Sequence, residues 1–269
     1  KAGAADPSNI YTILAKSMLT DIDRGILKHM LLSLGVEAGY FGTKEVRANR
    51  EKYGCNIPWQ ILLDPTSACN LKCKGCWAAE YGYKQSLTYD EMQSIISQGR
   101  DLGTHMYMLT GGEPLISDDV LSFMEKIKEL GFAVKLDTNG SYPERLKKAV
   151  ESGLADYVAM DIKNSKELYA ETAGLSFFDI EPIEESVEFL LKGNVDFEFR
   201  TTVVNGFHTV QSIEAAAKWI SGAPRYFLQN FIDSGCLIGE GITGVSKEEM
   251  LKMKNAAAKF VPNTQLRGI

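Results

Sequence analysis

From Trp59 onward, short apolar runs alternate with longer runs in which apolar positions recur at helical spacing. Six short runs have the length and the β-branched or aromatic content of strands: residues 59–66, 106–112, 133–140, 157–163, 196–204 and 225–232. A helical pattern follows each of them, at about 88–102, 117–130, 143–152, 180–193, 208–221 and 246–260. This alternation predicts an α/β fold of parallel strands with crossover helices, either a partial (β/α)6 barrel or an open doubly wound sheet.

The residues before Pro58 have a different pattern. Apolar side chains there recur at helical spacing between charged ones, at Ile10, Leu14, Met18, Ile22, Leu27 and Met30. We therefore predict a helical N-terminal extension over residues 1–56 and a barrel domain over residues 57–269.

Polar residues gather where the predicted strands end. They are Asp64 and Thr66, Thr110 with Gly111 and Gly112, Asp137 with Thr138 and Asn139, Asp161 with Lys163, and Arg200 with Thr202. Parallel α/β folds collect their functional residues at the carboxyl ends of the strands. We expect these side chains to share one rim.

Three of the five cysteines lie close together after the first predicted strand. Cys69, Cys73 and Cys76 have the spacing C-x3-C-x2-C, and the other two are Cys55 and Cys236. This odd, crowded set favours metal or cluster ligation over disulfides. Three thiolates would leave one iron of a [4Fe-4S] cluster open to a small molecule. A zinc knuckle with a distant fourth ligand is the alternative.

Two further motifs suit a charged ligand. Residues 111–114, Gly-Gly-Glu-Pro, combine glycines that let the backbone approach a ligand with a carboxylate that accepts from an ammonium group. Asp137 and Asp161 follow neighbouring strands. Because two adjacent carboxylates repel each other, they imply a positive guest between them.

Three more residues have two interpretations each. Lys163 either binds a carboxylate or lies on the surface. Arg200, inside an apolar strand, either reaches outward to solvent or pairs inside the barrel. His208 either caps the following helix or serves catalysis.

The charge of the chain narrows the classes of partner. A net charge of -6 argues against broad binding to nucleic acid or to an anionic membrane. No apolar run reaches the roughly 18 to 20 residues that span a bilayer, and the N-terminus lacks a signal-peptide layout. We therefore predict a cytoplasmic protein without nucleic-acid or membrane partners.

The motif "CNLKCKGC" after one strand, with "TGGEP" after the next, resembles the radical S-adenosylmethionine (SAM) superfamily. The resemblance runs from about residue 57 to the end and implies a [4Fe-4S] cluster and SAM as cofactors. The cluster ligands would be Cys69, Cys73 and Cys76. The element that binds the amino group of SAM would be Gly111, Gly112, Glu113 and Pro114. One departure is Gly75, where the family often has an aromatic residue; Trp77 is a nearby aromatic side chain.

A narrower resemblance divides the chain. The C-terminal two thirds, in "LDTNG", "DYVAMDIKNS", "EFRTTVV" and "FLQNFIDSG", is similar to activases of glycyl radical enzymes, of the anaerobic ribonucleotide reductase type. Residues 1 to about 120 look more like larger radical SAM proteins of unassigned function. In activases, the matching residues help to hold SAM; here they are Asp137, Asn139, Asp161, Lys163 and Arg200. The resemblance also implies a monovalent cation near Asp137 and Asp161.

The resemblance implies that SAM is cleaved reductively to a 5'-deoxyadenosyl radical, which then abstracts a hydrogen atom. For an activase, the hydrogen comes from a glycine of a partner glycyl radical enzyme, and flavodoxin or ferredoxin supplies the electron. A radical SAM enzyme that modifies a peptide or a small metabolite is the alternative. A non-catalytic iron–sulfur or zinc protein that binds a partner is the third interpretation.

Overall fold

The structure is a computed structural model. It describes residues 36, 39–73, 76, 86–104, 106–109, 111–130, 134–233 and 241–269, with the backbone alone for 106–109. Several positions named above lie outside the described residues: Gly75, Trp77, Thr110, Cys236 and the apolar positions from Ile10 to Met30. Among the described helices, none is long and apolar enough to cross a membrane.

The chain divides into two compact units, and the first comprises Lys1–Leu62 and Gln93–Met108. Its described elements are α3 (Thr43–Tyr53), β1 (Gln60–Leu63), α4 (Tyr89–Asp101) and β2 (Met106–Leu109), of which β1 and α4 extend into the second unit. The strands β1 and β2 pair with each other in a two-stranded sheet. Helix α3 lies within the predicted helical range 1–56, and the domain boundary at residue 56 stays a prediction.

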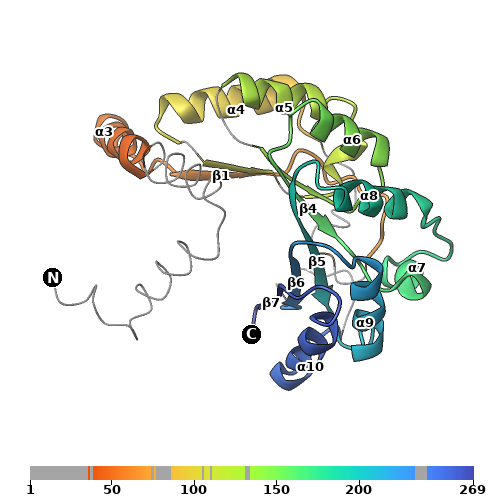
Figure 1. Ribbon diagram of the computed structural model, residues 1–269. Coiled ribbons are helices and arrows are strands. Elements are labelled where there is room, and N and C mark those ends of the chain that lie inside the picture. Colours follow the sequence, from red (N-terminus) through yellow and green to blue (C-terminus); the bar gives the residue numbers. More distant parts are fainter. Residues whose placement is uncertain are drawn as a thin grey trace. The chain divides into compact units, whose positions relative to one another are not determined.

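The second unit, Leu63–Met92 with Leu109–Ile269, contains a five-stranded parallel sheet (Figure 1). Its strands, in spatial as well as chain order, are β3 (Lys135–Thr138), β4 (Tyr157–Asp161), β5 (Asp196–Val203), β6 (Tyr226–Asn230) and β7 (Thr264–Arg267). The register places Asp161 opposite Arg200, and Thr202 opposite Gln229. Because all five strands are parallel, their carboxyl ends lie on the same edge of the sheet.

Helices connect these strands, as the sequence predicted. They are α5 (Val120–Glu129), α6 (Pro143–Glu151), α8 (Glu181–Leu191), α9 (Val210–Trp219) and α10 (Lys247–Ala257). Helices α6, α8 and α9 lie along one side of the sheet (Figure 1). Their apolar faces are buried: Leu146, Leu190 and Ile213, one from each of these helices, have no exposed surface. The predicted α/β class of parallel strands with crossover helices is confirmed.

The two faces of strand β5 have different chemistry. Phe197, Phe199, Thr201 and Val203 are buried, which is typical of the face covered by helices. Asp196, Glu198, Arg200 and Thr202 alternate with them and therefore point to the opposite face. The second face is polar even where it is buried: Glu198 accepts a 2.9 Å hydrogen bond from the Tyr157 hydroxyl and pairs with Arg267 at 3.3 Å. Charged residues on this face therefore do not point outward to solvent.

Three features differ from the predicted arrangement. The six predicted strands do not form one hydrogen-bonded sheet, because β1 and β2 pair separately from β3–β7. A seventh strand, β7, joins the sheet; its four residues include a single apolar one, too few for a strand pattern. A 3-10 turn, η3 (Lys166–Leu168), and the one-turn helix α7 (Tyr169–Thr172) follow β4, again too short for helical periodicity.

Candidate functional site

A cavity of about 360 Å3 lies at the carboxyl ends of strands β3 to β6, within the second unit. It brings together eleven of the twelve predicted site residues: Cys69, Cys73, Cys76, Gly111, Gly112, Pro114, Asp137, Asn139, Asp161, Lys163 and Arg200. The twelfth, Glu113, does not line it. The expectation of a shared rim is thus met in geometry, across segments that are far apart in the sequence.

The cysteines line the cavity from the segment that follows β1. Two hydrogen bonds shape this segment: the Cys76 amide donates to the Cys73 carbonyl at 3.0 Å, and the Leu71 amide donates to the Cys69 thiol at 3.4 Å. Burial raises the pKa of the Cys69 and Cys73 thiols, and the Lys163 ammonium opposes it. Coordination to a metal reverses the effect of burial, since only the thiolate is a ligand.

The donor set of this cavity fits an iron–sulfur cluster. Within the described part of the chain, no three His, Cys, Asp or Glu side chains converge to hold one metal ion. A cubane cluster requires no such convergence, because each thiolate binds a different iron atom. The amide of Asn139 donates toward the Cys69 sulfur at 3.6 Å, a contact of the kind that tunes cluster thiolates.

Gly111 and Gly112 lie directly against the segment that leads to the cysteines. A Cβ on Gly111 would come within 1.6 Å of a carboxylate oxygen of Asp64, and one on Gly112 within 2.1 Å of the Ala68 carbonyl oxygen. The Gly112 amide donates to the Thr66 carbonyl at 2.9 Å. Glycine is therefore required at both positions by close packing, and the backbone of these residues reaches the cavity.

Glu113 is placed differently from the sequence expectation. Its side chain has no exposed surface, and its Oε1 accepts from the Thr138 hydroxyl at 2.8 Å and from the Leu115 amide at 3.1 Å. Its Oε2 accepts from the Asn139 amide at 2.6 Å. These bonds tie the Gly-Gly-Glu-Pro turn to the end of β3. The carboxylate thus positions two cavity walls, and its contact with an amino group of SAM stays a prediction.

Burial raises the pKa of Glu113 to about 7, against the lowering effect of its three hydrogen-bond donors. Since the folded-state pKa lies above the ordinary value of 4.5, its contribution to stability is complete below pH 4.5 and is lost as the pH rises through 7. We expect the difference in unfolding free energy between wild type and Glu113→Gln to fall by up to about 3 kcal/mol over this range. Denaturant unfolding at several pH values measures it. The exposed Glu144→Gln serves as control, and a pH-independent difference for Glu113→Gln would contradict the assignment.

Arg200 lies between the two aspartates that the sequence singled out. Its Nη1 donates to Asp137 at 2.7 Å, and its Nε donates to Asp161 at 2.9 Å. Lys163 donates to the other oxygen of Asp161 at 3.0 Å, and Lys135 pairs with Asp137. The positive group between the carboxylates is therefore a guanidinium, in the place where we predicted a monovalent cation. The choice for Arg200 is also settled, because its side chain is only 19% exposed and points inward.

These charges stabilise one another. Burial would raise the pKa of Asp161, but Lys163 and Arg200 outweigh it and lower the pKa to about 2. Burial would likewise lower the pKa of both basic groups, whereas the aspartates raise it above its ordinary value. The cavity wall therefore keeps two carboxylates and two cations ionised at neutral pH, arranged to bind a ligand that carries both signs of charge.

His208 lines the cavity but is held by the backbone. Its Nδ1 accepts from the Val204 amide at 3.0 Å, so Nε2 carries the proton and donates to the Lys163 carbonyl at 2.8 Å. Burial lowers its pKa, which keeps the ring neutral. The expected helix cap is wrong: Thr209 caps α9 in a reciprocal pair with Ser212.

The cavity also includes residues that the sequence analysis did not single out. They are Leu71, Ile162, Thr172, Val204, Phe207 and Gln229. Four of these are apolar, so they keep water from part of the site. Gln229 was detectable, because it interrupts an apolar strand as Arg200 does. Thr172 was not, because α7 is a single turn.

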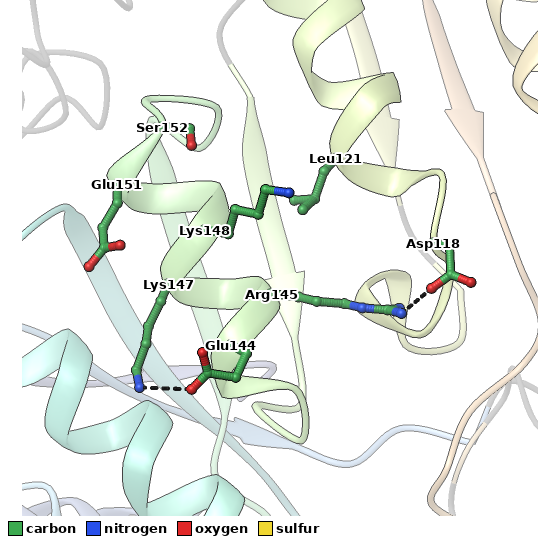
Figure 2. A pocket seen from close by; sticks show the side chains of 8 residues that line it. All are labelled: Asp118, Leu121, Glu144, Arg145, Lys147, Lys148, Glu151 and Ser152. Carbon is green, nitrogen blue, oxygen red and sulfur yellow. Dashed lines mark hydrogen bonds and ion pairs between the residues drawn. The ribbon is translucent and has the colours of Figure 1, made fainter.

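A second hollow of about 490 Å3 lies between α5 and α6 (Figure 2). Its charged side chains pair with one another: Arg145 with Asp118, and Lys147 with Glu144. Arg145 also donates to the Leu115 carbonyl at 2.6 Å. None of the predicted site residues lines this hollow. Its charges are thus satisfied within the protein, and the first cavity is the candidate site.

Comparison with known proteins agrees with this choice. The family model described as "Radical SAM superfamily" matches residues 63–220. The chain is 30% identical over 210 residues to the "Putative glycyl-radical enzyme activating enzyme MJ1227" of Methanocaldococcus jannaschii, covering 75% of this chain and 86% of that protein. It is 32% identical over 118 residues to the GTP 3',8-cyclase of Limosilactobacillus fermentum, covering 41% of this chain and 36% of the cyclase.

Among solved structures, Streptococcus suis SuiB bound to its precursor peptide SuiA superposes with a TM-score of 0.64 at 15% identity. The match covers 84% of this chain and 52% of SuiB. At this identity the likeness concerns the fold alone. This chain therefore spans about half of SuiB and about a third of the cyclase, with the parallel α/β architecture in common with SuiB.

Proposed function

Because the chain belongs to the radical SAM superfamily, we propose that it cleaves SAM reductively and removes a hydrogen atom from a glycine of a partner glycyl radical enzyme. The observation that carries the proposal is the single cavity in which three cysteines meet the charged ends of β3, β4 and β5. When bound, the [4Fe-4S] cluster and SAM supply the electron and the radical for this reaction.

The residues of the chain have separate tasks in this proposal. Cys69, Cys73 and Cys76 hold the cluster. The Asp161–Lys163 pair and Arg200 bind the charged groups of SAM. The apolar side chains on the cavity wall exclude water, which matters because a reactive radical takes hydrogen from any available donor. Glu113 acts one step away, by fixing the Gly-Gly-Glu-Pro turn against β3.

The choice of a glycine as hydrogen donor rests on the relative from M. jannaschii. That protein is named as an activating enzyme for a glycyl radical enzyme, and the similarity extends over most of both chains. The similarity to GTP 3',8-cyclase covers less than half of either chain. The activase is therefore the better-supported candidate, with flavodoxin or ferredoxin as the class of electron donor.

Isotope transfer tests the proposal. The reduced, cluster-loaded protein is incubated with SAM and with glycyl radical enzymes of the same source that were labelled with deuterated glycine. We expect 5'-deoxyadenosine to gain one deuterium and the partner to show a glycyl radical signal by electron paramagnetic resonance. A partner in which the acceptor glycine is replaced by alanine is the control and should give neither.

Two outcomes point elsewhere. Cleavage of SAM without deuterium transfer from any partner glycine would reject the activase role and favour a peptide or small-metabolite substrate. No cleavage of SAM by the reduced, loaded protein would reject the enzymatic function altogether and favour a binding protein.

A further inference from the structure

The short helix α7 makes direct backbone contact with the segment that carries the first two cysteines. The amide of Lys72, next to Cys73, donates to the carbonyl of Ala173 at 2.9 Å. Gly174 follows with a φ of +72°, and a Cβ built on it would lie 2.0 Å from the Lys72 carbonyl oxygen and 2.6 Å from its carbonyl carbon. The Lys72 peptide therefore occupies the space that a side chain at Gly174 would need.

Helix α7 is itself fixed to the end of β4, so this contact has a firm base. Asn164, which has no exposed surface, donates to the Thr172 hydroxyl at 2.9 Å. The Tyr169 hydroxyl, also buried, donates to the Asp161 carbonyl at 3.4 Å. The Ala173 side chain is completely buried. The same strand end that carries Asp161 thus holds the turn on which the cysteine segment rests.

Gly174 differs from most other glycines with positive φ. Gly153, Gly193 and Gly206 have φ values of +68°, +77° and +84°, with no heavy atom within 4 Å of a built Cβ. At those positions, only the backbone conformation demands glycine. At Gly174, conformation and close approach both demand it, and the approaching group is the backbone beside a cysteine.

We infer that Ala173 and Gly174 are positioning residues that set where the segment 69–73, and with it the Cys73 thiol, meets the cluster. The inference rests on the cluster-binding part of the proposed function but not on the hydrogen donor. A side chain at residue 174 would push the Lys72 peptide away and displace Cys73 relative to Cys69.

Paired substitutions separate displacement from backbone strain. Gly174→Ala adds a Cβ at a strained φ, whereas Gly174→Asn adds the same Cβ with a residue that tolerates this φ. Gly193→Ala and Gly193→Asn are matched controls with the same φ and open space. After anaerobic reconstitution, we expect both Gly174 variants to hold several-fold less iron and sulfide, and to lose iron to a chelator several-fold faster, than both Gly193 variants.

A second measurement uses the cluster-free protein. Lys72 is exposed, so trypsin cleavage after it reports how firmly the segment is held. We expect faster cleavage there in both Gly174 variants than in wild type or the Gly193 variants.

Equal iron content and equal cleavage in the Gly174 and Gly193 pairs would overturn the inference. So would failure of both Gly174 variants to fold while the Gly193 variants fold, since Gly174 would then serve general stability. If wild type itself binds no cluster, the cluster assignment fails instead, which is a distinguishable result.

Discussion

Replacing Cys69, Cys73 or Cys76 by alanine, one at a time, is expected to abolish both the brown chromophore and the cleavage of SAM. The three thiols line one cavity and the family binds its cluster through three cysteines, so no fourth cysteine stands in for a lost one. Anaerobic reconstitution followed by iron analysis, absorbance and detection of 5'-deoxyadenosine measures the effect.

Cys55→Ala is the matched control. Cys55 is exposed and belongs to the first compact unit, whereas the three ligands belong to the second. We expect Cys55→Ala to bind iron and cleave SAM like wild type, and Cys236→Ala to do the same. Loss of the cluster in Cys55→Ala would refute the ligand assignment and would favour the zinc-knuckle arrangement with a distant fourth ligand.

The chemistry at the strand ends was predictable because it depends on topology. Once the strands are parallel, Asp137, Asp161 and Arg200 must lie on one edge of the sheet, and the register then brings Asp161 opposite Arg200. Side-chain direction in a strand alternates, so one inward residue fixes the others. What the sequence lacked was the pairing: two carboxylates imply a positive guest, but only the structure identifies that guest as Arg200.

Other features depend on contacts that leave no local pattern. Glu113 follows two glycines, which predicts a ligand-facing carboxylate, yet the amide of Asn139 and the hydroxyl of Thr138 draw it into the interior. Helix α7 has one turn, so no periodicity announced it, although it seats the cysteine segment. Short elements and buried polar networks become visible only with tertiary contacts, because each of their bonds joins residues distant in sequence.

Asp161→Asn is expected to destabilise the protein and to weaken SAM binding together. The substitution leaves Lys163 without its carboxylate partner and removes half of the contacts of Arg200. Breaking a well-buried ion pair costs about 3–5 kcal/mol, and because this site is partly open to solvent we expect about 2 kcal/mol. Denaturant unfolding and calorimetric titration with SAM measure the two effects.

The acid dependence of stability gives an independent test of the same pair. Since the pKa of Asp161 is lowered to about 2 from an ordinary 3.8, its contribution is present above pH 4 and is lost as the pH falls toward 2. The difference in unfolding free energy between wild type and Asp161→Asn should therefore shrink in that window. Asp118→Asn, which breaks an exposed pair with Arg145, should cost less than about 0.5 kcal/mol and leave SAM binding unchanged. Equal losses in the two variants would mean that the Asp161 network has no special role, and that the cavity holds SAM by other groups.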